Sequence, residues 1–373
     1  MRNALVGLIS QAVTLMTAFI GRTIFIQQLG AEYLGVNGLF SNILSVLSLA
    51  ELGIGNVLLY TLYKPIHDKD DAKIRAILNY FRKLYLWIAA AILAIGAGIA
   101  PFLDSFAATP NIAGRELALY YFLFLGNSVI SYFVVHKSIL INADQRLFVV
   151  NTVNAAALLV RDIVQIVLLL VYGNFLIYLL VQMFFTFGSN AALNAAANKL
   201  YPFLRKAPRR KVEFTEKAEI LKNIKAVFLT RVGVIIMNYT DNILIAVLLG
   251  TVMVGYYSNY VLIITTVTNF INVLVNALFS SIGNLNAGEN REKSYQFFRF
   301  FVFLFNWITA AASLCLLVAM DDFIRLWIGE SYLLSREVLI AVVVNFYVHI
   351  VVTPLWVYRE TMGLFAKMKY LAL

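Results

Sequence analysis

Ten long apolar runs are the feature that most restricts the fold of this chain. They lie near residues 4–29, 36–63, 84–104, 117–141, 148–172, 175–198, 226–249, 254–283, 297–319 and 337–357. A helix needs about 20 mostly apolar residues to cross a bilayer, and every run reaches that length. The runs are continuous and do not alternate with a period of two, which excludes a membrane β-barrel pattern. The sequence therefore predicts an all-α polytopic membrane protein with about ten transmembrane helices.

Composition agrees with this class. Of the 373 residues, 61% are hydrophobic and 13% are charged, whereas a soluble domain is about 45–50% apolar and about 25% charged. The balance excludes a soluble enzyme and a disordered chain. Cys315 is the only cysteine, so the chain has no internal disulfide and no cysteine cage for a metal. There is no P-loop and no His-Glu-x-x-His motif, so we expect no enzyme activity, no cofactor and no metal site.

The distribution of Lys and Arg predicts the orientation. Segment 64–83 holds six of these residues and segment 199–225 holds nine, while loops 30–35, 173–174 and 250–253 hold none. Cationic loops remain on the cytoplasmic side of a membrane protein. We therefore expect a multi-pass protein with a cytoplasmic N-terminus and cytoplasmic basic loops. The basic loops should attract anionic membrane lipids, and nothing around them indicates nucleic-acid binding.

The chain also carries an internal repeat. When it is shifted by 220 residues, Leu29-Gly30 aligns with Leu249-Gly250 and Trp87 aligns with Trp307. Each copy would hold six spans, so both copies would enter the membrane in the same direction. This predicts two pseudo-symmetric six-helix lobes related by an axis along the membrane normal, with a site between them.

The repeat gives the expected domain boundaries. Residues 1–199 form the N-terminal lobe with helices 1–6, residues 200–222 a basic cytoplasmic linker, and residues 223–373 an incomplete C-terminal lobe with helices 7–10. Two copies of 220 residues make 440, and the chain ends at 373. We therefore expect the second lobe to be truncated and the chain to be a fragment of a longer transporter. Pro354 alone lies inside a span and predicts a kink or an early end there.

Ionisable side chains inside spans are costly and are candidates for function. Six stand out in the apolar runs: Arg22, Glu51, Arg161, Asp162, Arg231 and Asp241. The three arginines would make a cavity cationic, because guanidinium groups bind phosphate oxygens through paired hydrogen bonds. The three acids would then serve gating or ion coupling. A snorkelling anchor is the alternative role for Arg231, and close packing beside small residues is the alternative for Glu51.

Two pairing predictions follow from the positions of these residues. Asp162 directly follows Arg161, so on a helix the two side chains should point in different directions and need separate partners. Under the 220-residue shift, Arg22 corresponds to Asn242, which neighbours Asp241. We therefore expect Arg22 and Asp241 to form an outward gate or to share the ligand site.

Several segments resemble one known family. The segments are Arg22–Ile26, Leu29–Phe40, Leu49–Gly55, Tyr239–Ile243, Tyr257–Tyr260 and Ser281–Leu285. They are similar to bacterial polysaccharide-biosynthesis flippases, the O-antigen and capsular repeat-unit branch of the multidrug/oligosaccharidyl-lipid/polysaccharide exporter superfamily. The resemblance runs along nearly the whole chain.

The resemblance implies two six-helix lobes that work by alternating access around a cationic cavity. The implied substrate is an oligosaccharide on undecaprenyl pyrophosphate, moved from the cytoplasmic to the outer leaflet. Arg22, Arg161 and Arg231 are then expected to bind the pyrophosphate, with a polysaccharide polymerase and glycosyltransferases as partners. The alternatives are a multidrug or cation exporter of the same superfamily, a membrane-bound glycan polymerase or ligase, and a non-catalytic membrane partner of a glycan assembly system. Short outer loops without motifs argue against the polymerase or ligase.

Overall fold

The computed structural model describes residues 2–48, 54–103, 109, 111–206, 212–287 and 291–362. Within these ranges the regular structure is entirely helical. Seven helical segments are long and apolar enough to cross a membrane: Asp71–Phe102, Gly114–Ala143, Leu147–Tyr172, Phe175–Leu200, Thr251–Val275, Arg291–Trp327 and Arg336–Arg359. They match seven of the ten predicted runs. The other three predicted runs lie on α1 (Arg2–Leu47), α2 (Ile54–His67) and α10 (Phe214–Leu249) and stay predictions.

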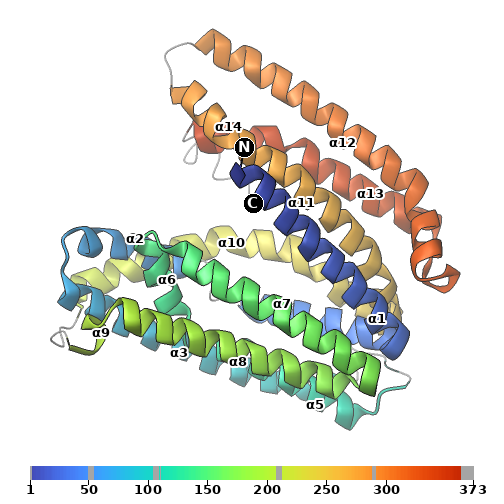
Figure 1. Cartoon of the computed structure of the whole chain (residues 1–373), viewed down its shortest axis with the longest axis horizontal. Coiled ribbons are helices and arrows are strands. Elements are labelled where there is room, and N and C mark those ends of the chain that lie inside the picture. The colour runs from blue at the N-terminus through green and yellow to red at the C-terminus, as the bar shows by residue number, and fades with distance from the viewer. Residues whose placement is uncertain are drawn as a thin grey trace. The chain divides into compact units, whose positions relative to one another are not determined.

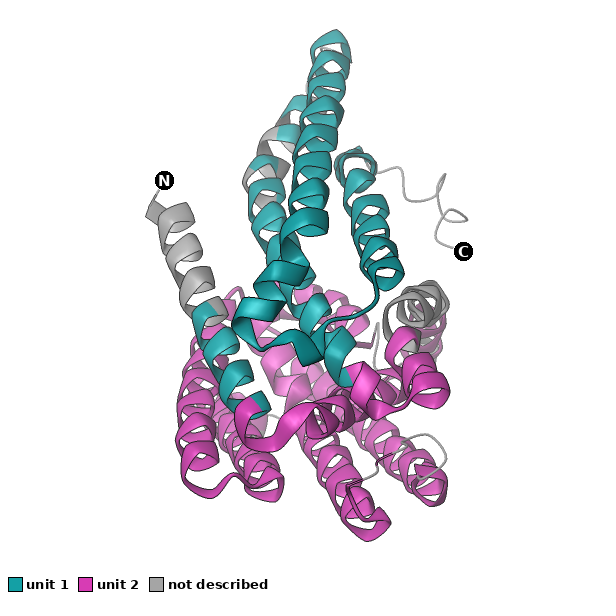
Figure 2. Ribbon diagram, turned by 90° about the vertical axis from the view of Figure 1, so that its right-hand side faces the viewer, with its two compact units in different colours: residues 1–26, 255–373 teal, residues 27–254 magenta. Residues whose placement is uncertain are grey.

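Packing divides the chain into two compact units, shown in Figure 2. Unit 1 contains Met1–Ile26 and Gly255–Leu373, and unit 2 contains Gln27–Val254. The chain therefore passes from one unit to the other twice, once within α1 and once in the first turn of α11 (Thr251–Ala287). These units do not follow the boundaries expected from the repeat, and the lobes 1–199 and 223–373 remain a prediction.

Unit 2 is a bundle built from the second part of α1 and the helices up to α10. Its further elements are α3 (Asp71–Ile99), η2 (Ala100–Phe102), α5 (Gly114–Ser131), α6 (Val135–Ala143), α7 (Leu147–Tyr172), α8 (Phe175–Leu200) and α9 (Phe203–Lys206). Helix α7 packs along α8, α8 also packs on α5, and α2 packs on α3 and α6 (Figure 1). Helices α3 and α5 approach closely at Gly96, where an added Cβ would lie 2.7 Å from Leu125 Cδ1.

Unit 1 combines the first part of α1 with the helices after Gly255. These are α11 (Thr251–Ala287), α12 (Arg291–Trp327), η3 (Glu330–Tyr332), α13 (Arg336–Val351) and α14 (Thr353–Thr361). Helix α12 packs along α13 and α14. The helix breaks between Val351 and Thr353, directly before Pro354. The kink predicted from Pro354 is confirmed, because proline ends the helix that precedes it.

Two glycines make the corners that connect the first and second helix of each repeat. Gly30 has φ 84° and ψ 178°, and Gly250 has φ 87° and ψ 165°. Both conformations lie in a region that is essentially restricted to glycine. The two positions are those that the 220-residue shift aligns. The backbone thus repeats at the two Leu-Gly pairs, which explains why glycine stands at both.

Each unit contains helices from both copies of the predicted repeat. The first helix of the first repeat, up to Ile26, belongs to unit 1 with α11–α14, which come from the second repeat. The first helix of the second repeat, α10, belongs to unit 2 with α2–α8. Each unit therefore combines the first helix of one predicted copy with later helices of the other.

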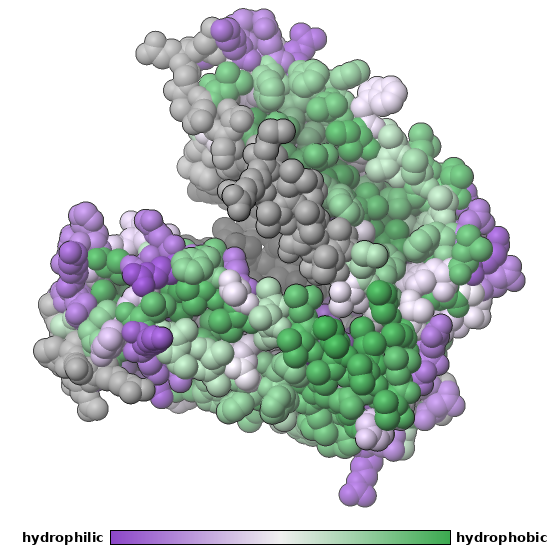
Figure 3. All heavy atoms as spheres, viewed as in Figure 1, coloured by the Kyte–Doolittle hydropathy of each residue, from purple (hydrophilic) through white to green (hydrophobic). Residues whose placement is uncertain are grey.

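The surface carries the apolar character that a bilayer requires. Large apolar side chains are exposed along α7 and α8, among them Ile163, Leu170, Phe184 and Phe187. Figure 3 shows apolar residues over the middle of the helices and hydrophilic residues gathered towards their ends. Apolar side chains in such numbers would be exposed to water in a soluble domain, whereas a membrane helix presents them to lipid.

Candidate functional site

Arg22 lies in unit 1, where polar side chains of α11 hold its guanidinium group. Its Nε donates to Asn259 Oδ1 at 3.0 Å, and its Nη2 donates to Ser258 Oγ. The Ser258 hydroxyl in turn donates to the carbonyl oxygen of Gly255 at 2.7 Å, and Asn259 is fully buried. Both of these acceptors are neutral oxygens, and the two bonds fix the orientation of the guanidinium. An oriented cation inside a span is suited to binding an anion.

The equivalent place in unit 2 contains a second polar residue. The 220-residue shift relates Arg22 to Asn242 and Ser258 to Gly38. In unit 2, a Cβ added to Gly38 would lie 4.0 Å from Asn242 Nδ2 and 3.4 Å from Val254 Cγ1. The same two positions of the repeat therefore face each other in both units. In unit 1 they are an arginine and a serine, and in unit 2 an asparagine and a glycine.

Arg161 and Asp162 form an ion pair on α7, which corrects the sequence prediction. Arg161 Nη2 lies 2.7 Å and Nε 3.0 Å from Asp162 Oδ1. The prediction that these neighbours need separate partners was wrong, because the long arginine side chain folds back to its neighbour. About a quarter of each side chain is exposed. The pair is close to neutral as a unit, so Arg161 carries less net charge towards its surroundings than a lone guanidinium would.

The other three candidates are less fully described. Glu51 lies outside the described residues, and Arg231 lies in α10 with its side chain outside the described part. Asp241 is exposed on α10. Its expected pairing with Arg22 stays a prediction.

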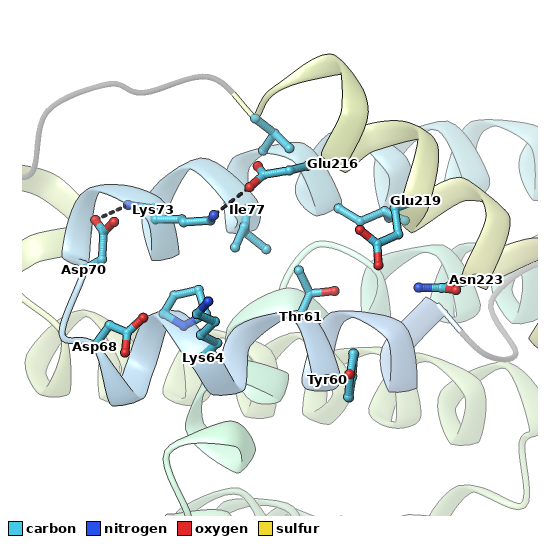
Figure 4. A pocket seen from close by; sticks show the side chains of 13 residues that line it. Tyr60, Thr61, Lys64, Asp68, Asp70, Lys73, Ile77, Glu216, Glu219 and Asn223 are labelled. Atoms are coloured by element: carbon cyan, nitrogen blue, oxygen red, sulfur yellow. Dashed lines mark hydrogen bonds and ion pairs between the residues drawn. The ribbon is translucent and has the colours of Figure 1, made fainter.

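A small polar cavity lies at one end of unit 2, between α2, α3 and the start of α10 (Figure 4). Its volume is about 190 Å³. The lining side chains are Tyr60, Thr61, Lys64, Pro65, Asp68, Asp70, Lys73, Ile77, Val212, Glu216, Glu219, Ile220 and Asn223. These residues include part of the basic segment that the sequence predicts to be cytoplasmic.

The start of α10 is fastened to α3 beside this cavity. Lys73 Nζ lies 2.6 Å from Glu216 Oε1, and Lys217 Nζ lies 6.0 Å from the centre of the Tyr80 ring. Ile220 of α10 is buried close by. The ion pair is about one third exposed on each side, so it contributes only about 0.2–1 kcal/mol.

Loop residues at the same end are also linked through Asp144. Tyr201 donates its hydroxyl to Asp144 Oδ2 at 2.8 Å, and Arg146 forms an ion pair with the same carboxylate at 3.0 Å. Burial, followed by the hydrogen bond to Asp144, raises the pKa of the Tyr201 phenol. The phenol therefore stays protonated near neutral pH and remains a donor.

Sequence reasoning missed two polar sites. Lys137 lies within a predicted span and donates to Asn194 Oδ1 at 2.5 Å and to Asn198 Oδ1 at 2.9 Å. Glu32 is buried and accepts hydrogen bonds from the backbone and side-chain amides of Asn111. The signal for the first site was available, since a cation inside an apolar run and two asparagines four residues apart on a helix indicate polar partners. The Glu32 contact joins distant segments and left no local signal.

Metal binding finds no support among the residues that the structure describes. In that part of the chain, no three His, Cys, Asp or Glu side chains gather in a way that could hold a metal ion.

Comparison with known proteins identifies the fold. No family model matches the sequence, and no curated protein matches it. Solved structures do match. An inward-facing multidrug resistance MATE family transporter of the MOP superfamily aligns with a TM-score of 0.62 and 18% identity, over 94% of this chain and 81% of that chain.

Two further solved structures extend the comparison. The lipid II flippase MurJ in an inward closed conformation aligns with a TM-score of 0.60 and 13% identity, over 95% of this chain and 76% of that chain. The MATE multidrug transporter DinF-BH aligns with a TM-score of 0.58 and 16% identity, over 98% of this chain and 83% of that chain. At these identities the likeness concerns the fold, so the chain has the fold of the MOP-superfamily transporters. The fold and the seven apolar helices together make it a multi-pass membrane protein.

Proposed function

We propose that this chain is a flippase that moves an oligosaccharide on undecaprenyl pyrophosphate from the cytoplasmic to the outer leaflet by alternating access. Two findings support transport as the general activity: the fold, and neighbours that include multidrug transporters and a lipid II flippase. The lipid-linked glycan rests on the sequence segments that resemble polysaccharide flippases. The expected two lobes, the bacterial inner membrane and the cytoplasmic N-terminus belong to the same proposal.

The observation that carries the proposal is the arrangement around Arg22. A pyrophosphate cannot cross hydrocarbon unaided, because each desolvated anion costs several kcal/mol. A transporter lowers this cost by replacing water with fixed hydrogen-bond donors. Asn259 and Ser258 accept hydrogen bonds from the Arg22 guanidinium and hold it in a fixed orientation. We assign the first contact with the pyrophosphate to Arg22.

Arg161 and Arg231 take secondary roles in this proposal. Arg161 Nη2 already lies 2.7 Å from Asp162 Oδ1. Arg161 would therefore bind the pyrophosphate only if the phosphate oxygens replaced Asp162 as its acceptor. Asp162 would then act as a gate that releases and recaptures the guanidinium. Arg231, Glu51 and Asp241 keep the binding, coupling and gating roles expected from their place inside predicted spans. The partners proposed are the lipid-linked oligosaccharide, anionic lipids, a polysaccharide polymerase and glycosyltransferases.

A multidrug or cation exporter is the alternative that a specific observation favours. Two of the three aligned structures described above are multidrug transporters by their own descriptions. Asp241 is exposed on α10, and an accessible carboxylate is a suitable ligand for a cationic drug.

A strain that lacks the gene separates the two functions. The flippase proposal predicts that this strain accumulates lipid-linked oligosaccharide on the inner leaflet, that wild-type protein restores glycan export, and that Arg22→Gln does not. It also predicts unchanged sensitivity to cationic drugs. Hypersensitivity to drugs with normal glycan export would overturn the flippase proposal and establish the exporter. Normal export and unchanged sensitivity would leave the third candidate, a non-catalytic partner of glycan assembly.

A further inference from the structure

Three aromatic side chains gather in unit 1, and one of them lies three residues before Arg22 on the same helix. Phe19 lies on α1, and Phe323 and Trp327 lie on α12. The ring centres of Phe19 and Trp327 are 4.9 Å apart, those of Phe323 and Trp327 are 5.7 Å apart, and those of Phe19 and Phe323 are 6.1 Å apart. Phe323 is 44% exposed, and the other two rings are half-buried. We call these three residues the aromatic platform.

A chain of hydrogen bonds fixes the indole of Trp327. Its Nε1 donates to Thr23 Oγ1 at 2.7 Å, and the Thr23 hydroxyl donates to the carbonyl oxygen of Phe19 at 2.8 Å. A tryptophan that serves only as a membrane-interface anchor needs no such partner in the protein, because headgroups and water supply one. Here the indole is tied to the helix that carries Arg22. Its orientation is therefore set by the protein.

The position of the platform relative to Arg22 matches the covalent structure of a sugar pyrophosphate. Phe19 lies three residues before Arg22 and four before Thr23 on α1, so its side chain neighbours each of theirs with about 5–6 Å between the Cβ atoms. In a glycosyl pyrophosphate, the first sugar ring is bonded directly to a phosphate oxygen. A phosphate held by Arg22 would place that ring about one helical turn away, beside the aromatic platform.

A second aromatic cluster, in unit 2, differs from the aromatic platform in its exposure. There, Tyr33, Tyr120 and Phe175 also cluster, with ring centres 4.9–6.2 Å apart. However, Phe175 is 2% exposed and Tyr120 is 7% exposed. That cluster is part of the packed core, and its faces are used by neighbouring protein groups. The aromatic platform of unit 1 keeps an exposed face.

We propose that the aromatic platform of Phe19, Phe323 and Trp327 stacks against the sugar ring next to the pyrophosphate, and that Trp327 is the residue that discriminates a glycosylated carrier from a bare one. This inference rests on the proposed flippase function and specifies which residues recognise the sugar of its substrate. Arg22 recognises the anion common to all such lipids, and Trp327 recognises the sugar.

The test measures translocation by the purified full chain in proteoliposomes with two probes. One is a polyprenyl pyrophosphate that carries a disaccharide, and the other is the same polyprenyl pyrophosphate without sugar. Trp327→Ala should lower the rate for the glycosylated probe roughly fivefold, the effect of losing an aromatic contact, and leave the rate for the bare probe unchanged. Trp327→Phe, which keeps a ring, should recover most of the lost rate.

Two control variants distinguish a loss of sugar recognition from a general loss of folded protein. Trp307→Ala removes a tryptophan of the same helix that is 67% exposed, and it should change neither rate. Thr23→Val keeps every ring but removes the partner of the indole, so it should lower the glycosylated rate by a smaller factor than Trp327→Ala. This second variant tests the platform even if Trp327→Ala fails to fold.

Each outcome decides the inference. Equal losses for both probes in Trp327→Ala, or no loss for either, would overturn it and leave the platform as an interface anchor. If wild-type protein moves neither probe, the proposed flippase function fails, and the sugar assignment fails with it. If wild-type moves both probes and Trp327→Ala does not distinguish them, the flippase function stands and only the sugar assignment is lost.

Discussion

Arg22 and Arg161 are two arginines inside predicted spans that differ in the charge of the acceptors just described. Arg22 in unit 1 donates to the neutral oxygens of Asn259 and Ser258. Arg161 in unit 2 donates twice to the carboxylate of Asp162. The two bonds described for Arg22 set the orientation of its guanidinium, whereas the carboxylate beside Arg161 also cancels most of that arginine's charge. An arginine in a predicted span can therefore already be committed to a neighbouring acid, and Arg161 must exchange that acid before it can bind an anionic ligand.

The first and largest prediction concerns the charge of Arg22. Arg22→Gln should weaken binding of a polyprenyl pyrophosphate to the purified protein by about 10–100-fold, since a hydrogen bond to a charged group contributes about 1.5–3 kcal/mol. Arg22→Lys should retain part of the affinity, because it keeps the charge and loses the paired donors. Titration of the lipid with a fluorescence or calorimetric readout measures both. Unchanged affinity in Arg22→Gln would remove the distinction between the two arginines.

The second prediction concerns the ion pair between Arg161 and Asp162 in unit 2. Asp162→Asn leaves the Arg161 guanidinium without its carboxylate and should lower the free energy of unfolding by about 2 kcal/mol, less than for a fully buried pair because a quarter of each side chain is exposed. Arg161→Gln combined with Asp162→Asn should recover much of that loss. Thermal unfolding of the purified variants measures the order. A double variant less stable than the single one would show that the pair does not act as a neutral unit.

The third prediction sharpens the role of the neutral partners. Asn259→Leu keeps the size of the side chain and removes the oxygen that orients Arg22, so binding of the pyrophosphate lipid should fall about fivefold, the equivalent of one hydrogen bond. Asn306→Leu is the control, because the Asn306 amide donates within its own helix, to the carbonyl oxygen of Val302. It should leave the affinity unchanged. Equal losses in both variants would point to a general loss of packing in unit 1.

The smallest effect is expected for an ion pair outside the apolar part of the helices. Lys73→Met or Glu216→Gln should change the free energy of unfolding by less than about 1 kcal/mol, because both groups are one third exposed. The difference from wild type should shrink further at high salt, which screens exposed charges. Unfolding at low and high ionic strength measures it. A loss as large as that of Asp162→Asn would contradict the argument that exposure weakens such pairs.

The sequence predicted the features that depend on local chemistry. The glycines at positions 30 and 250 were expected at span ends and do form two equivalent corners, because only glycine adopts their conformation without strain. The break before Pro354 follows from the missing N–H and the fixed ring of proline. Seven apolar helices appear where apolar runs predicted them.

The features that the sequence did not predict depend on contacts between distant segments or on side-chain rotamers. The Arg161–Asp162 pair required the arginine chain to fold back on its neighbour, which helix geometry alone argues against. The assignment of residues 1–26 to unit 1 and of α10 to unit 2 depends on packing between distant segments. The hydrophobic periodicity of each helix does not depend on which helices it packs against, so it could not predict this assignment. The Trp327–Thr23 bond joins residues 304 positions apart, so neither residue looked unusual in its own segment.

The most direct measurement of the central claim is translocation of an undecaprenyl-pyrophosphate-linked oligosaccharide in proteoliposomes that contain either wild-type protein or Arg22→Gln. Asp162→Asn combined with Arg161→Gln serves as the comparison, because it removes a second arginine of a predicted span. We predict that wild-type protein moves the lipid, that Arg22→Gln reduces the rate by at least about tenfold, and that the Arg161/Asp162 double variant, which removes a secondary contact, reduces it by a smaller factor. Loss of transport in the double variant with full transport in Arg22→Gln would contradict the account.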